Sequence, residues 1–418
     1  MKSLIKIGLI LSVIYPSYMS MHGFGEYVED NYNNSLFITE PSPYFVENNF
    51  SSIWKNTNSI LNVQYNFRSS QSDNFILADS YLASLNYTFP LNDLNYFSIG
   101  FNPYTISNAD FYASQYSYLP ANEIESLDSA IAYNVMYNND GGISRSYLSL
   151  LTKISNKVCL GFKYSFLFGN LERNRRIRLY DLNYSFDDEG QILTEYVLND
   201  SILINSTNEY SGSNFQIESK YKTEDIEYFV SGTYHFPLKV ESKFFFNEGI
   251  ENMQNLEQIQ TYFQPNQVIN YENEANLKNF YLGFRYKMNE IQSFLFKLDK
   301  NKAFNYNENS MYLPDTDSFS INLSFNSTSK IFTISDLNYI NYKIGLFYKK
   351  IENSTVSDYD YGLELDYGFR LLDQNYFALS LKVGEKSYQY MDLDNERYYL
   401  IGFKIENIEE WFLKGVKE

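Results

Sequence analysis

Apolar and polar residues alternate along much of this chain, most clearly between Gly141 and Leu179. Two alternating runs meet there at the polar pair Ser155 and Asn156. Side chains on a β-strand point alternately to opposite sides, so this pattern predicts a β-hairpin with one oily face. The oily face of its second strand is formed by Val158, Leu160, Phe162, Tyr164, Phe166 and Phe168. The small and polar residues between them argue against the core of a soluble sandwich and favour a hairpin in a membrane.

The same alternation recurs and predicts an all-β fold, an antiparallel up-and-down transmembrane β-barrel of about 14 strands, with a range of about 12 to 16. An even strand number is usual for a bacterial barrel made from one chain. Besides the two strands of the hairpin, strands are predicted at 59–68, 79–89, 95–102, 213–222, 226–236, 277–287, 291–299, 317–326, 341–350, 358–370, 375–386 and 395–405.

The connections between these strands fall into two classes. Mostly short ones are predicted at 90–94, 155–156, 223–225, 288–290, 327–340 and 371–374. Mostly long ones are predicted at 69–78, 103–142, 170–212, 237–276, 300–316, 351–357 and 387–394. Short periplasmic turns and long outer loops are typical of outer-membrane barrels. A soluble β-sandwich or propeller gives no reason for this asymmetry, which also places both termini in the periplasm.

The beginning of the chain has the character of an export signal. Lys2 and Lys6 precede an apolar run that is too short to span a membrane as a helix. We therefore expect a signal peptide at 1–20, removed after Sec export to a bacterial outer membrane. A plug-like or hatch-like segment is expected at 21–56, with a disordered leader as the alternative, then the barrel at 57–405 and a periplasmic tail at 406–418.

Composition changes this picture in two ways. The 41 Tyr and 34 Phe make the chain 18% aromatic, and barrels use such rings in girdles at both membrane interfaces. The net charge of −18 argues against nucleic acid as a partner.

The side chains that enzymes and metal sites use most are scarce. With Cys159 as the single cysteine and His22 and His235 as the only histidines, we expect no disulfide within the chain, no metal site and no cofactor. Histidine is the usual catalytic base, so we expect no enzyme and no catalytic residues.

An arginine cluster follows the second strand of the hairpin in this otherwise acidic chain. Above the outer interface, guanidinium groups could hold lipid phosphates or an anionic ligand, since they bind both in bidentate fashion. Pairing with acidic loops is the alternative. The cluster is Arg173, Arg175, Arg176 and Arg178.

The last four strands predict a wall of mixed charge inside the barrel. If Tyr342, Ile344, Leu346 and Tyr348 face lipid, the residues between them face the lumen. Such a wall could support a plug, form a polar conduction path, or simply fill the lumen with paired charges. The lumen candidates are Lys343, Lys349, Glu364, Asp366, Arg370, Lys382 and Lys404.

Four stretches resemble a known group of proteins. They are GFGEYVEDNYNNSL at 23–36, SIGFNPYTISNADF at 98–111, GGISRSYLSLLTKISNKVCLGFKYSFLFGN at 141–170 and WFLKGVKE at 411–418. They resemble outer-membrane proteins of the Bacteroidetes and Marinimicrobia kind, which are similar in pattern to the long-chain fatty-acid transporter (FadL/TodX) family. The resemblance implies a 14-stranded barrel with an N-terminal hatch, through which hydrophobic molecules pass.

Two functions follow as expectations. The first is passive uptake of hydrophobic or amphipathic small molecules similar to long-chain fatty acids. The second is a non-transporting scaffold or assembly partner of a secretion or surface-attachment system. Expected partners are outer-membrane lipid and lipopolysaccharide, a hydrophobic small-molecule ligand in the first case, and a periplasmic or surface protein in the second.

Overall fold

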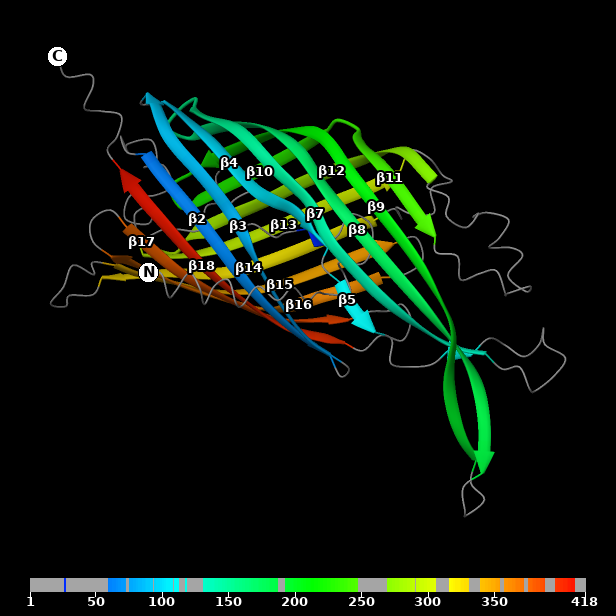
Figure 1. The fold of residues 1–418 in the computed structure, drawn as a ribbon. Coiled ribbons are helices and arrows are strands. Elements are labelled where there is room, and N and C mark those ends of the chain that lie inside the picture. The colour runs from blue at the N-terminus through cyan, green and yellow to red at the C-terminus, as the bar shows by residue number, and fades with distance from the viewer. Residues whose placement is uncertain are drawn as a thin grey trace.

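The strands of this protein form one antiparallel sheet that closes on itself (Figure 1). It is seen in a computed structural model. The residues described are 26–27, 59–72, 75–92, 94–107, 109–112, 117–118, 131–186, 192–246, 269–289, 291–305, 316–330, 339–353, 357–371, 375–387 and 395–409. The expected signal peptide and all but two residues of the expected hatch lie outside them.

The strands follow the order of the chain around the sheet. Their bounds are β1 Glu26–Tyr27, β2 Ser59–Ser72, β3 Phe75–Asn92, β4 Asn95–Ile106, β5 Ala109–Tyr112, β6 Ser117–Tyr118, β7 Ile131–Lys153, β8 Val158–Phe186, β9 Ile192–Lys222, β10 Ile226–His235, β11 Leu238–Phe246, β12 Ile269–Lys287, β13 Gln292–Asn305, β14 Thr316–Lys330, β15 Tyr339–Asn353, β16 Ser357–Leu371, β17 Asn375–Ser387 and β18 Glu396–Glu409.

Closure is made by β18, which pairs with β2 from Arg397 opposite Gln71 to Glu409 opposite Ser59. β10 and β11 both lie between β9 and β12, so they act as one barrel strand interrupted before Leu238. The short β1, β5 and β6 pair beside β4 and β7. The result is a closed 14-strand antiparallel barrel, as the sequence predicts.

The outer surface of the barrel is an apolar belt. Tyr164, Phe166 and Phe168 of β8 are 37%, 50% and 45% exposed, whereas Lys163 and Ser165 between them are buried. The hairpin therefore has the predicted orientation, with its oily face outward and its polar face inward. A closed barrel with this belt spans a membrane, because pairing of its first and last strands leaves the sheet without free outer edges. Among the described residues, no helix is long and apolar enough to cross a membrane.

Several segments that the sequence suggested as loops are strands. β2 and β3 run through most of the expected loop 69–78, and β8 and β9 fill most of 170–212. β4 takes up the start of 103–142, and β7 takes up its end from Ile131, where the alternation over 131–137 already indicates a strand extension. β11 and β12 take up both ends of 237–276. The loop prediction was wrong in β8 and β11 because their outward positions lose their apolar residues there, although the backbone pairing continues. The long β8–β9 hairpin extends far from the barrel at the lower right of Figure 1.

Two glycines mark the level at which β7 leaves the barrel wall. Gly141 and Gly142 have φ values of 113° and 149°, which favour glycine, and the strand runs through them instead of ending. A Cβ on Gly142 would meet the backbone of Thr105. At the other end of the chain, β18 runs to Glu409, so Glu406 to Glu409 lie in the strand and not in the expected tail.

Among the described residues, β3 and β4 pair along only part of their length. Their pairing runs from Asn92 opposite Asn95 to Leu85 opposite Phe101, and beyond that point residues 75–84 of β3 pair with β2 alone among the described residues. These residues make roughly 30 Å of strand. Further along β4, Thr105 and Ile106 instead pair with β1. We call this part of the wall the β3–β4 split.

A β-bulge stands on each side of the split. The β2–β3 register shifts at Ala83, and the β4–β7 register shifts at Tyr104. A bulge adds one residue to a strand, bends it and increases its local twist. The two bulges thus account for the divergence of strands that are paired at the other end.

The apolar belt predicts that a charged substitution destabilises the barrel more in the middle of the membrane than at its edge. Leu346 in the middle of β15 and Ile154 in the β7–β8 turn are 56% and 60% exposed. In lipid vesicles, Leu346→Arg should lower the free energy of unfolding by about 2–4 kcal/mol, and Ile154→Arg by about 0–1 kcal/mol. Urea unfolding followed by intrinsic fluorescence or by gel mobility measures both. Equal small losses would show that Leu346 faces water.

Candidate functional site: the lumen and the split in its wall

An apolar cluster lies on the inner wall next to the split. Its members are carried by β4, β7, β8, β9 and β11, and all of them are buried. We call it the inner apolar patch. It consists of Tyr104, Ile143, Leu167, Leu171, Tyr210, Leu238 and Val240.

Strand register holds these residues at one level of the barrel. Ile143 lies opposite Thr105, next to the bulged Tyr104, and Val240 lies opposite Tyr210. Thr105 also pairs with β1 at the edge of the split. The patch is therefore continuous with the part of β4 that has left β3.

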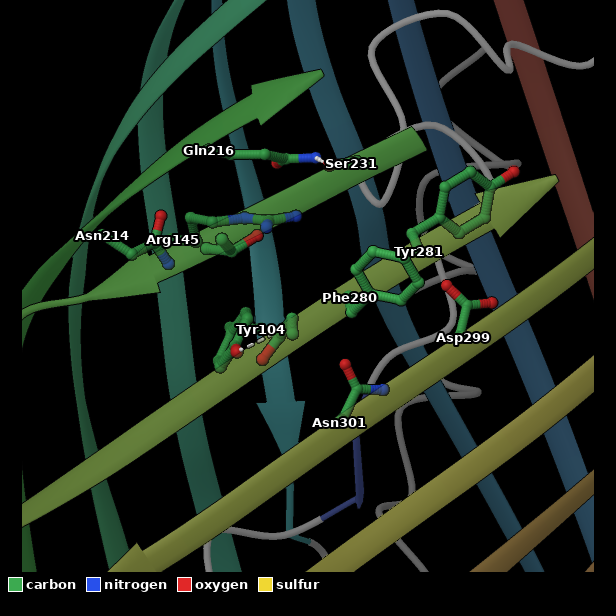
Figure 2. A pocket seen from close by; sticks show the side chains of 11 residues that line it. Tyr104, Arg145, Asn214, Gln216, Ser231, Phe280, Tyr281, Asp299 and Asn301 are labelled. Carbon is green, nitrogen blue, oxygen red and sulfur yellow. Dashed lines mark hydrogen bonds between the residues drawn. The ribbon is translucent and has the colours of Figure 1, made fainter. Parts of the chain in front are cut away.

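On the level of the inner wall next to the inner apolar patch, most of the inward side chains are polar. They surround a cavity of about 20 Å³, which holds about one water molecule. In Figure 2, Arg145 and Asn214 approach it from one side and Asp299 and Asn301 from the other. Phe280, labelled in the same view, is an outward residue of β12 that is 47% exposed.

Hydrogen bonds hold the lining of this cavity in place. Arg145 Nε donates to Asn102 Oδ1 at 3.1 Å, and Asn279 Nδ2 donates to the Tyr104 hydroxyl at 3.2 Å. Gln216 Nε2 donates to Ser231 Oγ at 2.8 Å. The Tyr104 bond joins β4 to β12 across the lumen and so links opposite sides of the cavity.

The predicted mixed-charge wall lies on the inner face of β15 to β18. Lys343 Nζ is 3.0 Å from Glu364 Oε2 and 3.1 Å from Asp366 Oδ2, and all three side chains are at most 10% exposed. Asn322 Nδ2 also donates to Glu364 Oε2 at 3.2 Å. These three side chains lie on the inward phase of β15 and β16, and their role as a ligand site stays a prediction.

The remaining lumen candidates are less closely grouped. Lys349 and Lys404 are buried on the inner face, and the Lys382 ammonium lies 3.9 Å from the centre of the Phe347 ring. The side chain of Arg370 lies outside the described set. Paired filler, one of the three readings of the sequence, fits the contacts of Lys343, and the functional role of the wall stays a prediction.

The four arginines do not form one cluster. Arg173 is buried, in line with the inward residues of β8, whereas Arg176 is exposed on the opposite face. Arg178 shares the face of Arg176 and is half-buried, and the side chain of Arg175 lies outside the described set. Alternation along β8 separates neighbours that the sequence brings together.

Aromatic rings in the lumen lie over glycines of the adjacent strand. Tyr398 lies opposite Gly384 and Phe347 opposite Gly362 in the strand register. The Tyr398 hydroxyl donates to Asp360 Oδ1 at 2.9 Å, which holds the ring flat against the wall. The missing Cβ on the glycine makes the space for each ring.

Alternation alone does not predict the inner apolar patch. A signal is present, since Leu167 and Leu171 fall on the inward phase of β8, and Leu238 and Val240 share one phase of β11. The pattern of 170–212 and 237–276 is nevertheless typical of loops, which hides this signal. The patch became visible only once those strands were known to continue.

Comparison with known proteins gives structural neighbours only. No family model and no curated sequence matches the chain. A Pseudomonas aeruginosa FadL homologue is 10% identical, with 95% of this chain and 99% of that chain covered and a TM-score of 0.48. The CymD monoaromatic hydrocarbon channel is 10% identical, covers 95% and 98%, and has a TM-score of 0.48. The P. putida toluene transporter TodX is 7% identical, covers 86% and 92%, and has a TM-score of 0.45.

These neighbours are of the FadL/TodX kind that the sequence resembles. At such identities and with TM-scores below 0.5, we take no functional conclusion from them.

The ion-pair group of Lys343, Glu364 and Asp366 predicts that the stability of the barrel depends strongly on its central lysine. Lys343→Met should lower the free energy of unfolding by about 3–5 kcal/mol, because it leaves two carboxylates buried without their cation. The triple variant Lys343→Met, Glu364→Gln, Asp366→Asn should recover most of that loss. Urea titration in detergent measures both variants. A small effect of Lys343→Met would mean that water reaches the group freely.

The glycine–ring pairs predict a contrast between two glycines. A Cβ on Gly384 would come 2.7 Å from the Tyr398 ring, whereas one on Gly232 would meet nothing within 4 Å. Gly384→Ala should therefore destabilise the barrel by about 1–3 kcal/mol through overpacking. Gly232→Ala should be neutral or stabilise it by about 0.5–1 kcal/mol, since glycine weakens a strand. The same unfolding titration compares them, and equal effects would contradict the close contact.

Proposed function

We propose that this protein is an outer-membrane barrel for passive uptake of hydrophobic or amphipathic small molecules similar to long-chain fatty acids. The observation that carries the proposal is the inner apolar patch next to the β3–β4 split. An apolar surface on the inner wall has no use in solvating ions or sugars. It does lower the free energy of an apolar solute, by about 25 cal/mol for each Å² removed from water.

The route that these features support is sideways. The level next to the patch carries hydrogen-bonded polar side chains around a cavity of about 20 Å³, so a hydrocarbon that passed through this cavity would strip those groups of their partners. The split offers an exit from the patch into the bilayer without crossing that level. In this proposal the solute enters from the long-loop side, rests on the patch and leaves between β3 and β4.

β1 has the position of a gate in this route. Glu26 and Tyr27 pair with Ile106 and Thr105 on the β4 edge that the split exposes. An unpaired strand edge is costly in lipid, so a covering segment is expected when the barrel is at rest. Release of β1 would open the edge, which fits the expected hatch role of 21–56.

The proposal is tested by uptake into cells. The chain is expressed in a diderm host that lacks its own long-chain fatty-acid transporter, and uptake of labelled fatty acids and monoaromatic compounds is compared with an empty vector. Faster uptake of at least one apolar class is expected. Unchanged uptake across the whole panel would overturn the proposal and leave the scaffold alternative.

The patch itself is tested by one pair of variants. Val240→Thr places a hydroxyl in the patch at nearly constant volume, whereas Val230→Thr makes the same change on the outward face, where Val230 is 42% exposed. If burying a hydroxyl costs an apolar solute about 1–2 kcal/mol, Val240→Thr should slow uptake by about five- to thirtyfold. Val230→Thr should leave the rate unchanged. Equal rates in the two variants would remove the patch from the route.

A further inference from the structure

Four lysines lie on the outer surface of the barrel, toward the long-loop end of neighbouring strands. On β12 they share the outward phase of Phe280 and Leu282, and on β15 that of Tyr348. Three of them are exposed, and the side chain of the fourth, Lys350, is 33% exposed. We call them the outer lysine group. It consists of Lys278 of β12, Lys300 and Lys302 of β13 and Lys350 of β15.

Strand register brings these lysines together. Lys302 lies directly opposite Lys278, and Lys300 lies opposite Phe280. On β14, Phe319 lies opposite both Lys300 and Lys350 and so stands between them. Directly opposite residues of an antiparallel pair share one face of the sheet. The group therefore forms one patch that spans three strand spacings, or about 14 Å.

The outer lysine group begins where the apolar belt ends. On β12 the outward residues change from Leu282 and Phe280 to Lys278, and on β15 Tyr348 is followed by Lys350. Aromatic rings are typical of the membrane interface, and a lysine there lays its stem on apolar surface while its ammonium group reaches outward. The ammonium groups therefore lie at the level of lipid head groups.

The other edge of the belt has no counterpart on these strands. Toward the short turns, the described outward side chains of β12 to β15 include no lysine or arginine. The two leaflets of the membrane thus meet different chemistry on the same wall. In an outer membrane the outer leaflet contains lipopolysaccharide, whose lipid A carries phosphate groups. The outward side chains at the short-turn edge are Tyr286, Met288, Gln292, Phe294, Phe325 and Tyr342.

Acidic side chains accompany the lysines but leave them open to lipid. Asp317 Oδ2 is 3.5 Å from Lys300 Nζ, and Glu352 contacts Lys350. The side chains of Asp317 and Glu352 are 30% and 49% exposed, and ion pairs in such exposed positions are weak and exchange partners readily. A lipid phosphate can therefore join these pairs or replace a carboxylate, so no lysine needs to be without a partner.

Other acids of these strands are more distant or lie outside the described part of the chain. Glu274 is four residues beyond Lys278 on β12, about 13 Å along the strand. That separation exceeds the screening length of about 8 Å at physiological salt. Asp315 precedes β14 and lies outside the described residues.

We propose that the outer lysine group is a binding site for lipopolysaccharide. The ammonium groups of Lys300 and Lys302 donate to phosphate oxygens of lipid A, with Lys278 and Lys350 on either side. The acyl chains lie along the apolar belt below. The sequence suggested arginines of β8 for lipid phosphates, but alternation divides those between two faces, whereas these lysines share one. The site rests on the outer-membrane location in the proposed function, and it uses no residue of the inner apolar patch or of the split.

The test measures how firmly purified barrel retains lipopolysaccharide in a non-ionic detergent, by native mass spectrometry. EDTA is present, so that divalent cations cannot bridge carboxylates of the barrel to phosphate. We expect lipopolysaccharide to be retained in preference to phosphatidylethanolamine and phosphatidylglycerol. Dephosphorylated lipopolysaccharide should bind about tenfold more weakly, because the charge-assisted hydrogen bonds to phosphate are lost.

Two matched pairs of variants locate the site. Lys300→Gln with Lys302→Gln should weaken retention about thirtyfold, since two cations next to an anionic lipid surface are removed. The control, Lys153→Gln with Lys157→Gln, removes two lysines beside the β7–β8 turn at the other end of the barrel and should bind as the unaltered chain does.

A charge-preserving variant tests whether the loss reflects charge. Lys300→Arg with Lys302→Arg should keep its lipopolysaccharide, because guanidinium also binds phosphate. Heat-dependent gel mobility confirms that each variant is folded before it is measured.

Three outcomes would overturn the proposal. They are equal retention by the two glutamine variants, unchanged binding after dephosphorylation, and retention of phosphatidylglycerol as firm as that of lipopolysaccharide, which would indicate general attraction of anionic lipid. Because binding is measured on purified barrel, its failure is distinct from a failure of the uptake assay in cells.

Discussion

Every feature of this barrel follows from the need to pair all backbone groups in a medium without water. A strand inside lipid must give each N–H and C=O a partner on a neighbouring strand, and the β18–β2 pairing supplies the last of these partners. Closure then leaves the side chains with only two environments, oil outside and lumen inside. The alternation of Tyr164, Phe166 and Phe168 with Lys163 and Ser165 is the direct result.

The same constraint gives the β3–β4 split its significance. Parting two strands exposes backbone groups, and the chain meets this cost with a bulge on each strand and with β1 laid along the β4 edge. A defect of this kind is expensive in lipid and would not persist without support. Its support comes from Tyr104, whose bulged side chain joins the inner apolar patch and accepts a hydrogen bond from Asn279 on β12.

Charge inside the barrel is arranged in two opposite ways. On β15 and β16 one cation, Lys343, lies between two carboxylates at close range, which is a compact pairing suited to holding strands together. On β9, β10 and β12 one carboxylate, Glu227, lies among four cations at distances of 3.3 to 4.0 Å, near the short turns. In both groups, charged side chains of neighbouring strands meet on the inner face of the sheet.

The sequence predicts these features only where the lipid restricts which residues a position can carry. Where a strand crosses lipid, its outward positions must be apolar, so alternation revealed the strands and, by phase, the inward placement of Lys343 and Glu364. Beyond the apolar belt, outward residues no longer need to be apolar, although the strands continue to pair. The sequence of β8 and β9 from residue 170 to 212 is therefore typical of a loop. The inner apolar patch lies at this boundary. Distances between side chains of different strands, such as those around Glu227, can be predicted only when the register of three strands is known. Register is a property of the closed sheet, which is why the alternation of any single strand could predict the barrel but not the groups that meet inside it.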